Sequence, residues 1–146
     1  MKKMLLGIGN ELKGDDGIGN IIARQFRHDG WKSVPCETVP ENFTAVVGRE
    51  SPDILVIVDA ADMELPPGEI RIIPKEKLGA ESTSTHRMPL RHLVEHLSEY
   101  TKQVVFIGIQ PKSQNIGDEV SEEVFRAKKK VMKALEKNDF SFVERL

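Results

Sequence analysis

The sequence predicts a single domain over residues 1–146, of three-layer α/β/α class, with a mainly parallel, mixed central sheet of about five strands. Three observations lead to this prediction. Short apolar runs typical of buried strands alternate with amphipathic stretches typical of helices. The run Ile54–Val58 is apolar on both faces, as expected of a central strand covered on both sides. A chain of 146 residues has the size of one domain.

Strands are predicted where apolar runs are bounded by turn residues. In chain order, the predicted strands are Met4–Ile8, Trp31–Thr38, Ile54–Val58, Glu69–Ile73 and Val104–Ile109. Pro35 weakens the second strand, because proline has no N–H to donate to a sheet. The last nine residues are expected either to add an edge strand or to fray.

Helices are predicted where apolar residues recur at helical spacing. In chain order, the predicted helices begin at Ile18 and end between Arg27 and Gly30, extend from Pro40 through Val47, span Pro89–Tyr100, and span Ser121–Lys137. Ser121 is the expected N-cap of the last and longest helix. The polar segment of residues 81–87 is rich in serine and threonine, which is typical of a loop.

The composition argues against several classes of function. The chain has 21 Lys and Arg against 23 Asp and Glu, a formal charge of −2, so we expect no binding of nucleic acid through bulk charge. No apolar run reaches the roughly 18 residues that span a bilayer, and Met4–Ile8 is too short for a signal-peptide core. We therefore expect a cytoplasmic protein without membrane insertion. The single Cys36 excludes an internal disulfide and a cysteine-based zinc cage.

Candidate functional residues follow the predicted strands, because ligands of such sheets bind outside the carboxyl ends of the strands. Asp15 and Asp16 come between the first strand and the first helix. One carboxylate is enough to cap that helix, which leaves the other to face a cleft. Asp59 and Asp62 follow the central strand, and His86 lies among small hydroxyl residues just before a helix.

Two literal motif matches have weaker physical support. Residues 7–14 are similar to a dinucleotide fingerprint, but Leu12 stands where that fingerprint needs glycine. The segment His92–His96 matches the H-x-x-E-H pattern of zinc peptidases. Its two histidines, however, fall opposite the apolar stripe of their helix and are expected to face solvent.

Asp16, Asp62 and His86 together provide two carboxylates and one imidazole. Such a donor set suits a divalent metal of borderline hardness, such as nickel, zinc or cadmium. Their spacing in the sequence does not by itself bring the three side chains together.

Residues 7–19, GIGNELKGDDGIG, resemble the opening motif of the hydrogenase maturation endopeptidases. Five further blocks resemble the same family in the same order. They are Pro40–Asn42, Val58–Met63, Pro67–Arg71, Thr85–Leu90 and Gly108–Pro111. The resemblance extends to about Gln110, and the Asp-Ala-Ala-Asp-Met and Thr-His-x-Met-Pro-Leu blocks most resemble the branch serving formate-hydrogenlyase-type hydrogenases.

The resemblance implies an endopeptidase that removes the C-terminal extension of the [NiFe]-hydrogenase large-subunit precursor after nickel insertion. The precursor is then the partner, and the nickel arrives with it, although zinc or cadmium can occupy the site in vitro. The catalytic and metal-contacting positions fall on Asp16, Asp62 and His86. The family label is aspartic-type, and the activation of water by metal or by carboxylate stays open.

Two other hypotheses compete with this one. A non-catalytic, chaperone-like module would bind and inspect the nickel-loaded precursor without changing its mass. A self-contained zinc peptidase would use His92 and His96 and would contain stoichiometric zinc. The absence of an obvious exposed apolar stripe favours a monomer.

Overall fold

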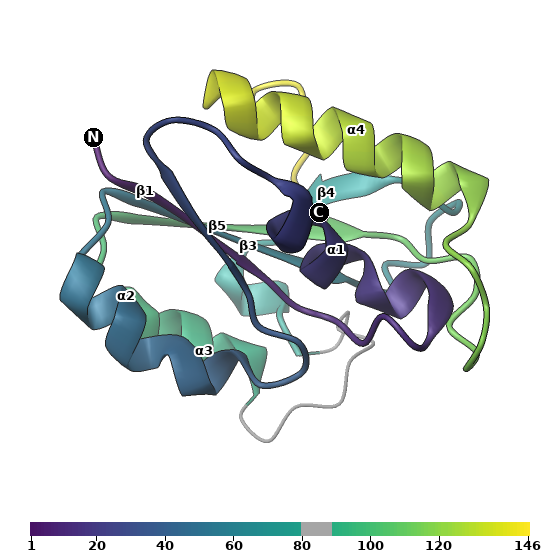
Figure 1. Cartoon of the computed structure of the whole chain (residues 1–146), viewed down its shortest axis with the longest axis horizontal. Coiled ribbons are helices and arrows are strands. Elements are labelled where there is room, and N and C mark those ends of the chain that lie inside the picture. Colours follow the sequence, from purple (N-terminus) through teal and green to yellow (C-terminus); the bar gives the residue numbers. More distant parts are fainter. Residues whose placement is uncertain (80–88) are drawn as a thin grey trace.

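The computed structural model describes residues 1–79 and 89–146, in which strands and helices alternate around one central sheet (Figure 1). Within these residues the sheet consists of β1 (Lys3–Gly7), β2 (Trp31–Pro35), β3 (Ile54–Ala60), β4 (Ile70–Ile72) and β5 (Gln103–Ile109). Their order is β2-β1-β3-β5-β4. The pairs are parallel except for β4, which is antiparallel to β5. The predicted mainly parallel, mixed sheet is confirmed.

Helices cover both faces of this sheet. The α-helices are α1 (Ile18–Gln25), α2 (Thr44–Glu50), α3 (Leu90–Leu97) and α4 (Glu122–Lys137). The short 3₁₀ helices are η1 (Gly14–Gly17), η2 (Pro40–Phe43) and η3 (Lys75–Lys77). Helices α1 and α4 lie on one face, and α2 and α3 lie on the other, which confirms the three layers (Figure 1).

The core consists of two apolar clusters, one on each face of the sheet. Every residue of β3 is buried, as its two-sided apolar sequence predicts. Leu55 and Ile57 belong to the cluster under α2 and α3, whereas Val56 and Val58 belong to the cluster under α1 and α4. Burying a side chain of this size contributes roughly 1.5–3 kcal/mol, so this strand anchors both layers.

The structure corrects several element boundaries. β3 extends beyond the predicted Val58 to Ala60, and β2 ends at Pro35, where the sheet loses an N–H donor. Helix α3 is shorter than predicted, ending at Leu97. At the C-terminus, residue 145 forms one isolated parallel bridge with residue 72 of β4, so the last residues contact the sheet edge without forming the full edge strand that one alternative predicted. The predicted loop of residues 81–87 lies outside the described residues.

The topology determines where a ligand can bind. β1 is flanked by β2 on one side and β3 on the other, and the connections to them lie on opposite faces of the sheet. The carboxyl ends of β1 and β3 therefore form a topological switch point, where such sheets bind ligands.

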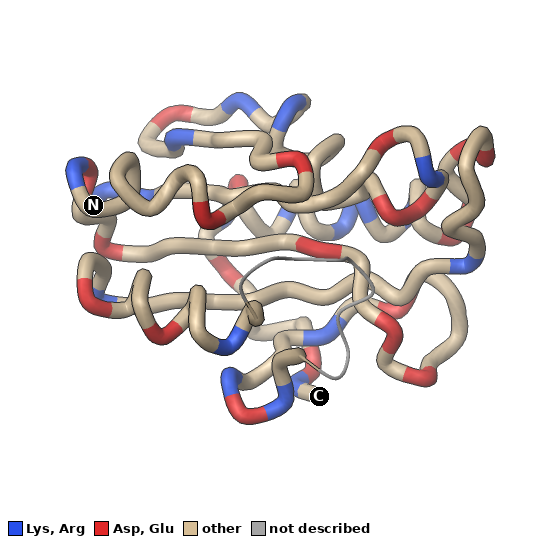
Figure 2. Tube along the Cα trace, turned by 90° about the horizontal axis from the view of Figure 1, so that it is seen from below, with Lys and Arg blue, Asp and Glu red and all other residues tan. Residues whose placement is uncertain are grey.

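Within residues 1–79 and 89–146, no helix is long and apolar enough to cross a membrane. Acidic and basic positions are interspersed along the chain (Figure 2).

Candidate functional site

Glycines allow the segment after β1 to approach its neighbours closely. A Cβ on Gly9, whose φ is +147°, would lie 2.1 Å from the backbone oxygen of Asp16. A Cβ on Gly19 would lie 2.1 Å from the backbone oxygen of Val58. Both distances are impossible for real atoms, so glycine is required at these positions. The two glycines thus allow η1 and the start of α1 to pack directly against the ends of β1 and β3.

This packing places Asp16 at the switch point. Its side chain is only 4% exposed. The Asn10 backbone N–H donates to Oδ2 of Asp16 at 3.2 Å, and the Gln114 amide donates to Oδ1 at 2.9 Å. Two segments therefore hold the carboxylate of Asp16. One is the loop after β1, through the Asn10 N–H, and the other is the loop after β5, through the Gln114 side chain.

Asp15 has a different role from its neighbour. It is fully buried and accepts hydrogen bonds from the backbone N–H groups of Lys112, Ser113 and Ser121, at 2.9, 3.2 and 2.7 Å. The Ser121 hydroxyl donates to it at 2.8 Å and also accepts from the third residue of α4. Neither aspartate caps η1 or α1 through its side chain, so the capping prediction is wrong. Asp15 instead fixes the β5–α4 loop (residues 110–121).

Asp62 lies two residues past the end of β3 and is exposed. The Gln110 side-chain amide donates to Oδ1 of Asp62 at 3.2 Å. The other end of that amide, Oε1, accepts from the backbone N–H groups of Met63 at 2.6 Å and Leu65 at 3.3 Å. Gln110, which is only 7% exposed, thereby attaches the Asp62 loop to the end of β5.

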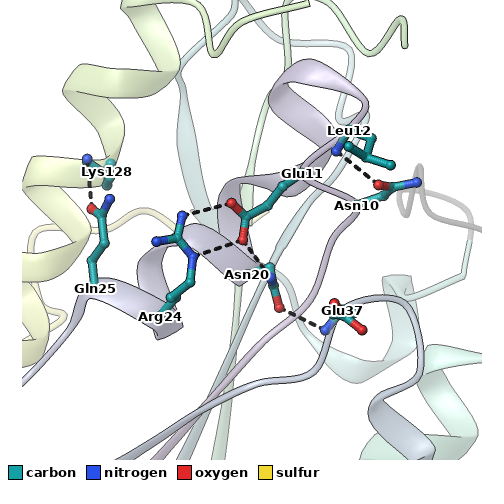
Figure 3. Close-up of polar contacts among 8 residues, drawn as sticks. All are labelled: Asn10, Glu11, Leu12, Asn20, Arg24, Gln25, Glu37 and Lys128. Carbon is teal, nitrogen blue, oxygen red and sulfur yellow. Dashed lines mark hydrogen bonds and ion pairs between the residues drawn. The ribbon is translucent and has the colours of Figure 1, made fainter. Parts of the chain in front are cut away.

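A second polar network forms one wall of the site (Figure 3). Glu11 accepts from Arg24 at 2.8 Å and from the Asn20 amide at 2.7 Å, while the Asn20 oxygen accepts from the backbone N–H of Glu37 at 2.8 Å. The hydrogen bond from Arg24 lowers the pKa of Glu11. These bonds join the loops after β1 and β2 to α1. Between the two loops is a pocket of about 390 Å³, lined by residues 9–12, 20, 37 and 38.

The other candidate residues are buried in a strand, exposed on a helix or outside the described residues. Asp59, expected in the loop after the central strand, is a buried residue within β3. His92 and His96 are exposed on the outer face of α3, as predicted, and no three His, Cys, Asp or Glu side chains within the described part of the chain form a cluster that could hold a metal. His86 lies outside the described residues, so its distance to Asp16 and Asp62 stays untested.

Cys36 is excluded as a nucleophile by its surroundings. The thiol is 1% exposed, and burial, together with the nearby charge of Glu41, raises its pKa to about 12. A cysteine reacts as the thiolate, which this environment suppresses at neutral pH. The chemical groups offered at the switch point are therefore carboxylates and amides.

Sequence reasoning missed the two glutamines that contact the aspartates. Gln110 is the first polar residue after a buried strand, the same signal that identified Asp62. Gln114 carries no such signal, because it lies in a polar loop 98 residues away from Asp16. Two carboxylates held in this way can bind a cation, orient a water or accept a proton.

Comparisons with known proteins agree on one family. A family model described as hydrogenase maturation protease matches residues 21–138. The hydrogenase 3 maturation protease of Escherichia coli K12 is 39% identical over 115 residues, covering 76% of this chain and 74% of its own. A crystal structure of a hydrogenase 3 maturation protease superposes with a TM-score of 0.91 at 32% identity, covering 100% of this chain and 97% of the other.

A crystal structure of a [NiFe] hydrogenase maturation protease from Thermococcus kodakarensis KOD1 is also similar. It has a TM-score of 0.81 at 28% identity and covers 93% of this chain and 90% of its own. Both the sequence matches and the structural matches thus extend over most of the chain, and the relatives are named as proteases. The chain belongs to the hydrogenase maturation protease family and is a hydrolase.

Proposed function

We propose that this protein is the endopeptidase that removes the C-terminal extension of a [NiFe]-hydrogenase large-subunit precursor once nickel has been inserted. In this proposal Asp16, Asp62 and His86 contact the nickel carried by the precursor. The observation that supports it best is the placement of Asp16 and Asp62 after two adjacent parallel strands, β1 and β3, at the switch point of the sheet.

The donor set fits a metal that arrives with a substrate. Two carboxylates and an imidazole are acceptable ligands of a borderline divalent ion, but they lack the thiolates of a permanent structural site. They can complete the coordination of an ion whose other ligands belong to the precursor. Docking is then most favourable when nickel is present, so the metal content of the precursor decides whether it is cleaved.

Peptide hydrolysis needs a water oxygen to attack the carbonyl carbon, the C–N bond to break, and a proton to reach the leaving amine. A nickel ion beside the scissile bond would polarise that carbonyl. An aspartate beside it would take the proton of the attacking water. This is the sense in which we class the protein with aspartic-type peptidases. The pocket between the loops after β1 and β2 adjoins Asp16 through Asn10 and would take the precursor chain next to the cleaved bond.

The deciding experiment compares nickel-loaded and nickel-free precursor, each incubated with the purified protein and analysed by intact mass. We expect a shortened large subunit and a released peptide from the loaded precursor alone. Equal cleavage of both forms would contradict nickel recognition. Binding without any change of mass would identify a chaperone-like module instead.

The site assignment is tested with Asp16→Asn, Asp62→Asn and His86→Ala. Each should lower the processing rate at least 100-fold while the far-UV circular dichroism stays unchanged, since each removes one donor to the metal. Asp29→Asn is the matched control, because Asp29 is exposed in the turn before β2. Normal activity in two of the three variants would refute the assignment.

We also propose that the protein acts as a monomer in the cytoplasm, and sedimentation of the purified protein tests the first point.

A further inference from the structure

The β5–α4 loop contributes one glutamine amide to each of the two aspartates at the switch point. Gln110 donates to Asp62 at 3.2 Å, and Gln114 donates to Asp16 at 2.9 Å. The two aspartates belong to different strand ends, whereas the two glutamines are four residues apart in one loop. We propose that Gln110 and Gln114 are positioning residues, which set the direction and separation of the two carboxylates. This inference rests on the proposed function of Asp16 and Asp62.

The orientation of the Gln110 amide is determined by its surroundings. Its Oε1 faces two backbone N–H groups, those of Met63 and Leu65, so the oxygen must be on that side. The Nε2 group then has to face Asp62. One planar amide thus fixes both the backbone of the loop that carries Asp62 and the carboxylate itself, from a position that is 93% shielded from solvent.

The glutamines are themselves held by a rigid support. Gln110 directly follows β5, and its own backbone N–H donates to the Glu69 carbonyl at 2.9 Å. Asp15 binds the same loop on both sides of Gln114, at residues 112 and 113 before it and at residue 121 after it, through four hydrogen bonds. The Asp15 backbone N–H adds a fifth bond, to the Ser113 carbonyl at 2.9 Å. The loop therefore cannot move away from the aspartates without losing buried contacts.

Each glutamine also uses particular oxygens of its aspartate. Gln110 occupies Oδ1 of Asp62, an oxygen that the Glu64 backbone N–H also approaches at 3.1 Å. Among the described residues none donates a hydrogen bond to Oδ2 of Asp62, which leaves this oxygen available to an incoming metal. A misplacement of about 1 Å in such a constellation can lower a rate by about 100-fold. The positioning bonds should therefore matter more for rate than for stability.

The sharpest test is Gln110→Glu, because the glutamate keeps the size of the side chain and the acceptor for Met63 and Leu65. It replaces only the N–H donor by an anionic oxygen facing Asp62. A purely structural role predicts a lower stability but an unchanged processing rate for the folded variant. We expect the first-order rate constant for processing, measured with enzyme in excess over nickel-loaded precursor, to fall about 10- to 100-fold. The half-saturating enzyme concentration should stay within about threefold, since the rest of the docking surface is unchanged.

Two further variants complete the design. Gln114→Glu makes the same change beside Asp16, in a side chain that is only partly buried, so we expect this variant to fold. Gln103→Glu is the matched control, because Gln103 is exposed at the opposite end of β5. We expect Gln114→Glu to lower the rate constant about 10-fold and Gln103→Glu to leave it unchanged. Rate constants for Gln110→Glu and Gln114→Glu equal to that of the control would overturn the inference.

A double variant tests the contact in solution without using activity. Combining Gln110→Glu with Asp62→Asn exchanges the donor and the acceptor, so the hydrogen bond can form again. We expect the double variant to regain the thermal midpoint that Gln110→Glu loses, but not the processing rate. No recovery of the midpoint would contradict the contact, including the case where Gln110→Glu alone does not fold. Normal processing by the single variant Asp62→Asn would contradict the proposed function. If Asp62→Asn loses activity while the glutamine variants keep it, the proposed function stands and the positioning role is wrong.

Discussion

Replacing Asp15 by alanine should destabilise the fold strongly, because its carboxylate joins η1 to the β5–α4 loop and to the start of α4. The side chain is fully buried and accepts four hydrogen bonds from that loop. A hydrogen bond to a charged group contributes roughly 1.5–3 kcal/mol, but relaxation lets water reach some of the abandoned donors. A buried donor left without an acceptor costs about 1–3 kcal/mol, so with this relaxation we expect Asp15→Ala to lose about 3–5 kcal/mol in total.

The distribution of these bonds also predicts an intermediate effect for Asp15→Asn. Oδ2 accepts from Lys112, Ser113 and the Ser121 hydroxyl, whereas Oδ1 accepts from the Ser121 N–H alone. An asparagine can keep an oxygen at the position of Oδ2, but its NH₂ group then faces the Ser121 N–H. We therefore expect a loss of about 2–3 kcal/mol in the free energy of unfolding.

Urea denaturation followed by circular dichroism measures both variants, and the thermal midpoint of Asp15→Ala should fall by about 6–20 °C. Asp29→Ala is the control, because Asp29 is exposed. Asp16→Asn should lose only about 1 kcal/mol, since its bonds to the Asn10 N–H and to the Gln114 side chain can be kept with reoriented amides. A loss below about 1 kcal/mol for Asp15→Ala would refute the view that the two neighbouring aspartates have separate roles.

Three further predictions concern groups around the site. Glu11→Gln should lower the thermal midpoint by about 1–3 °C. Because Arg24 lowers the pKa of Glu11, this difference should be present above about pH 5 and disappear as the pH falls through the folded-state pKa. Cys36, with a pKa of about 12, should resist iodoacetamide at pH 8 unless denaturant is present, as mass spectrometry would show. Changing His92 and His96 together to alanine should leave processing unchanged, and a tenfold loss would revive the zinc-peptidase hypothesis.

The sequence was sufficient to predict the layers of the fold and the sheet edge that carries the candidate residues Asp16 and Asp62. Apolar residues on both faces of Ile54–Val58 require cover on both sides, and parallel strands then bring their carboxyl ends together. This reasoning predicts that Asp16 and Asp62 lie at the same edge of the sheet. It did not find the end of β3, because Asp59 is polar and yet buried within the strand.

The contacts that hold the aspartates could not be predicted in the same way. Asp15 bonds to Ser121 across 106 positions, and Gln114 bonds to Asp16 across 98. Such pairs follow from tertiary packing and leave no periodic or local signal in one sequence. The segment after Gln110 was uninformative as a motif for this reason, although its Gln114 donates to Asp16.

The different roles of Asp15 and Asp16 follow from the local geometry of η1. In a 3₁₀ helix three residues complete a turn, so adjacent side chains point about 120° apart. When Asp15 points into the β5–α4 loop, Asp16 points elsewhere, and its carboxylate accepts from the Asn10 N–H and the Gln114 amide. The two aspartates are therefore coupled through the loop, because the buried Asp15 holds the segment whose Gln114 contacts Asp16. If this coupling is correct, Asp15→Asn should lower the processing rate even under conditions where the variant is fully folded, and an unchanged rate there would show that the loop needs no such support.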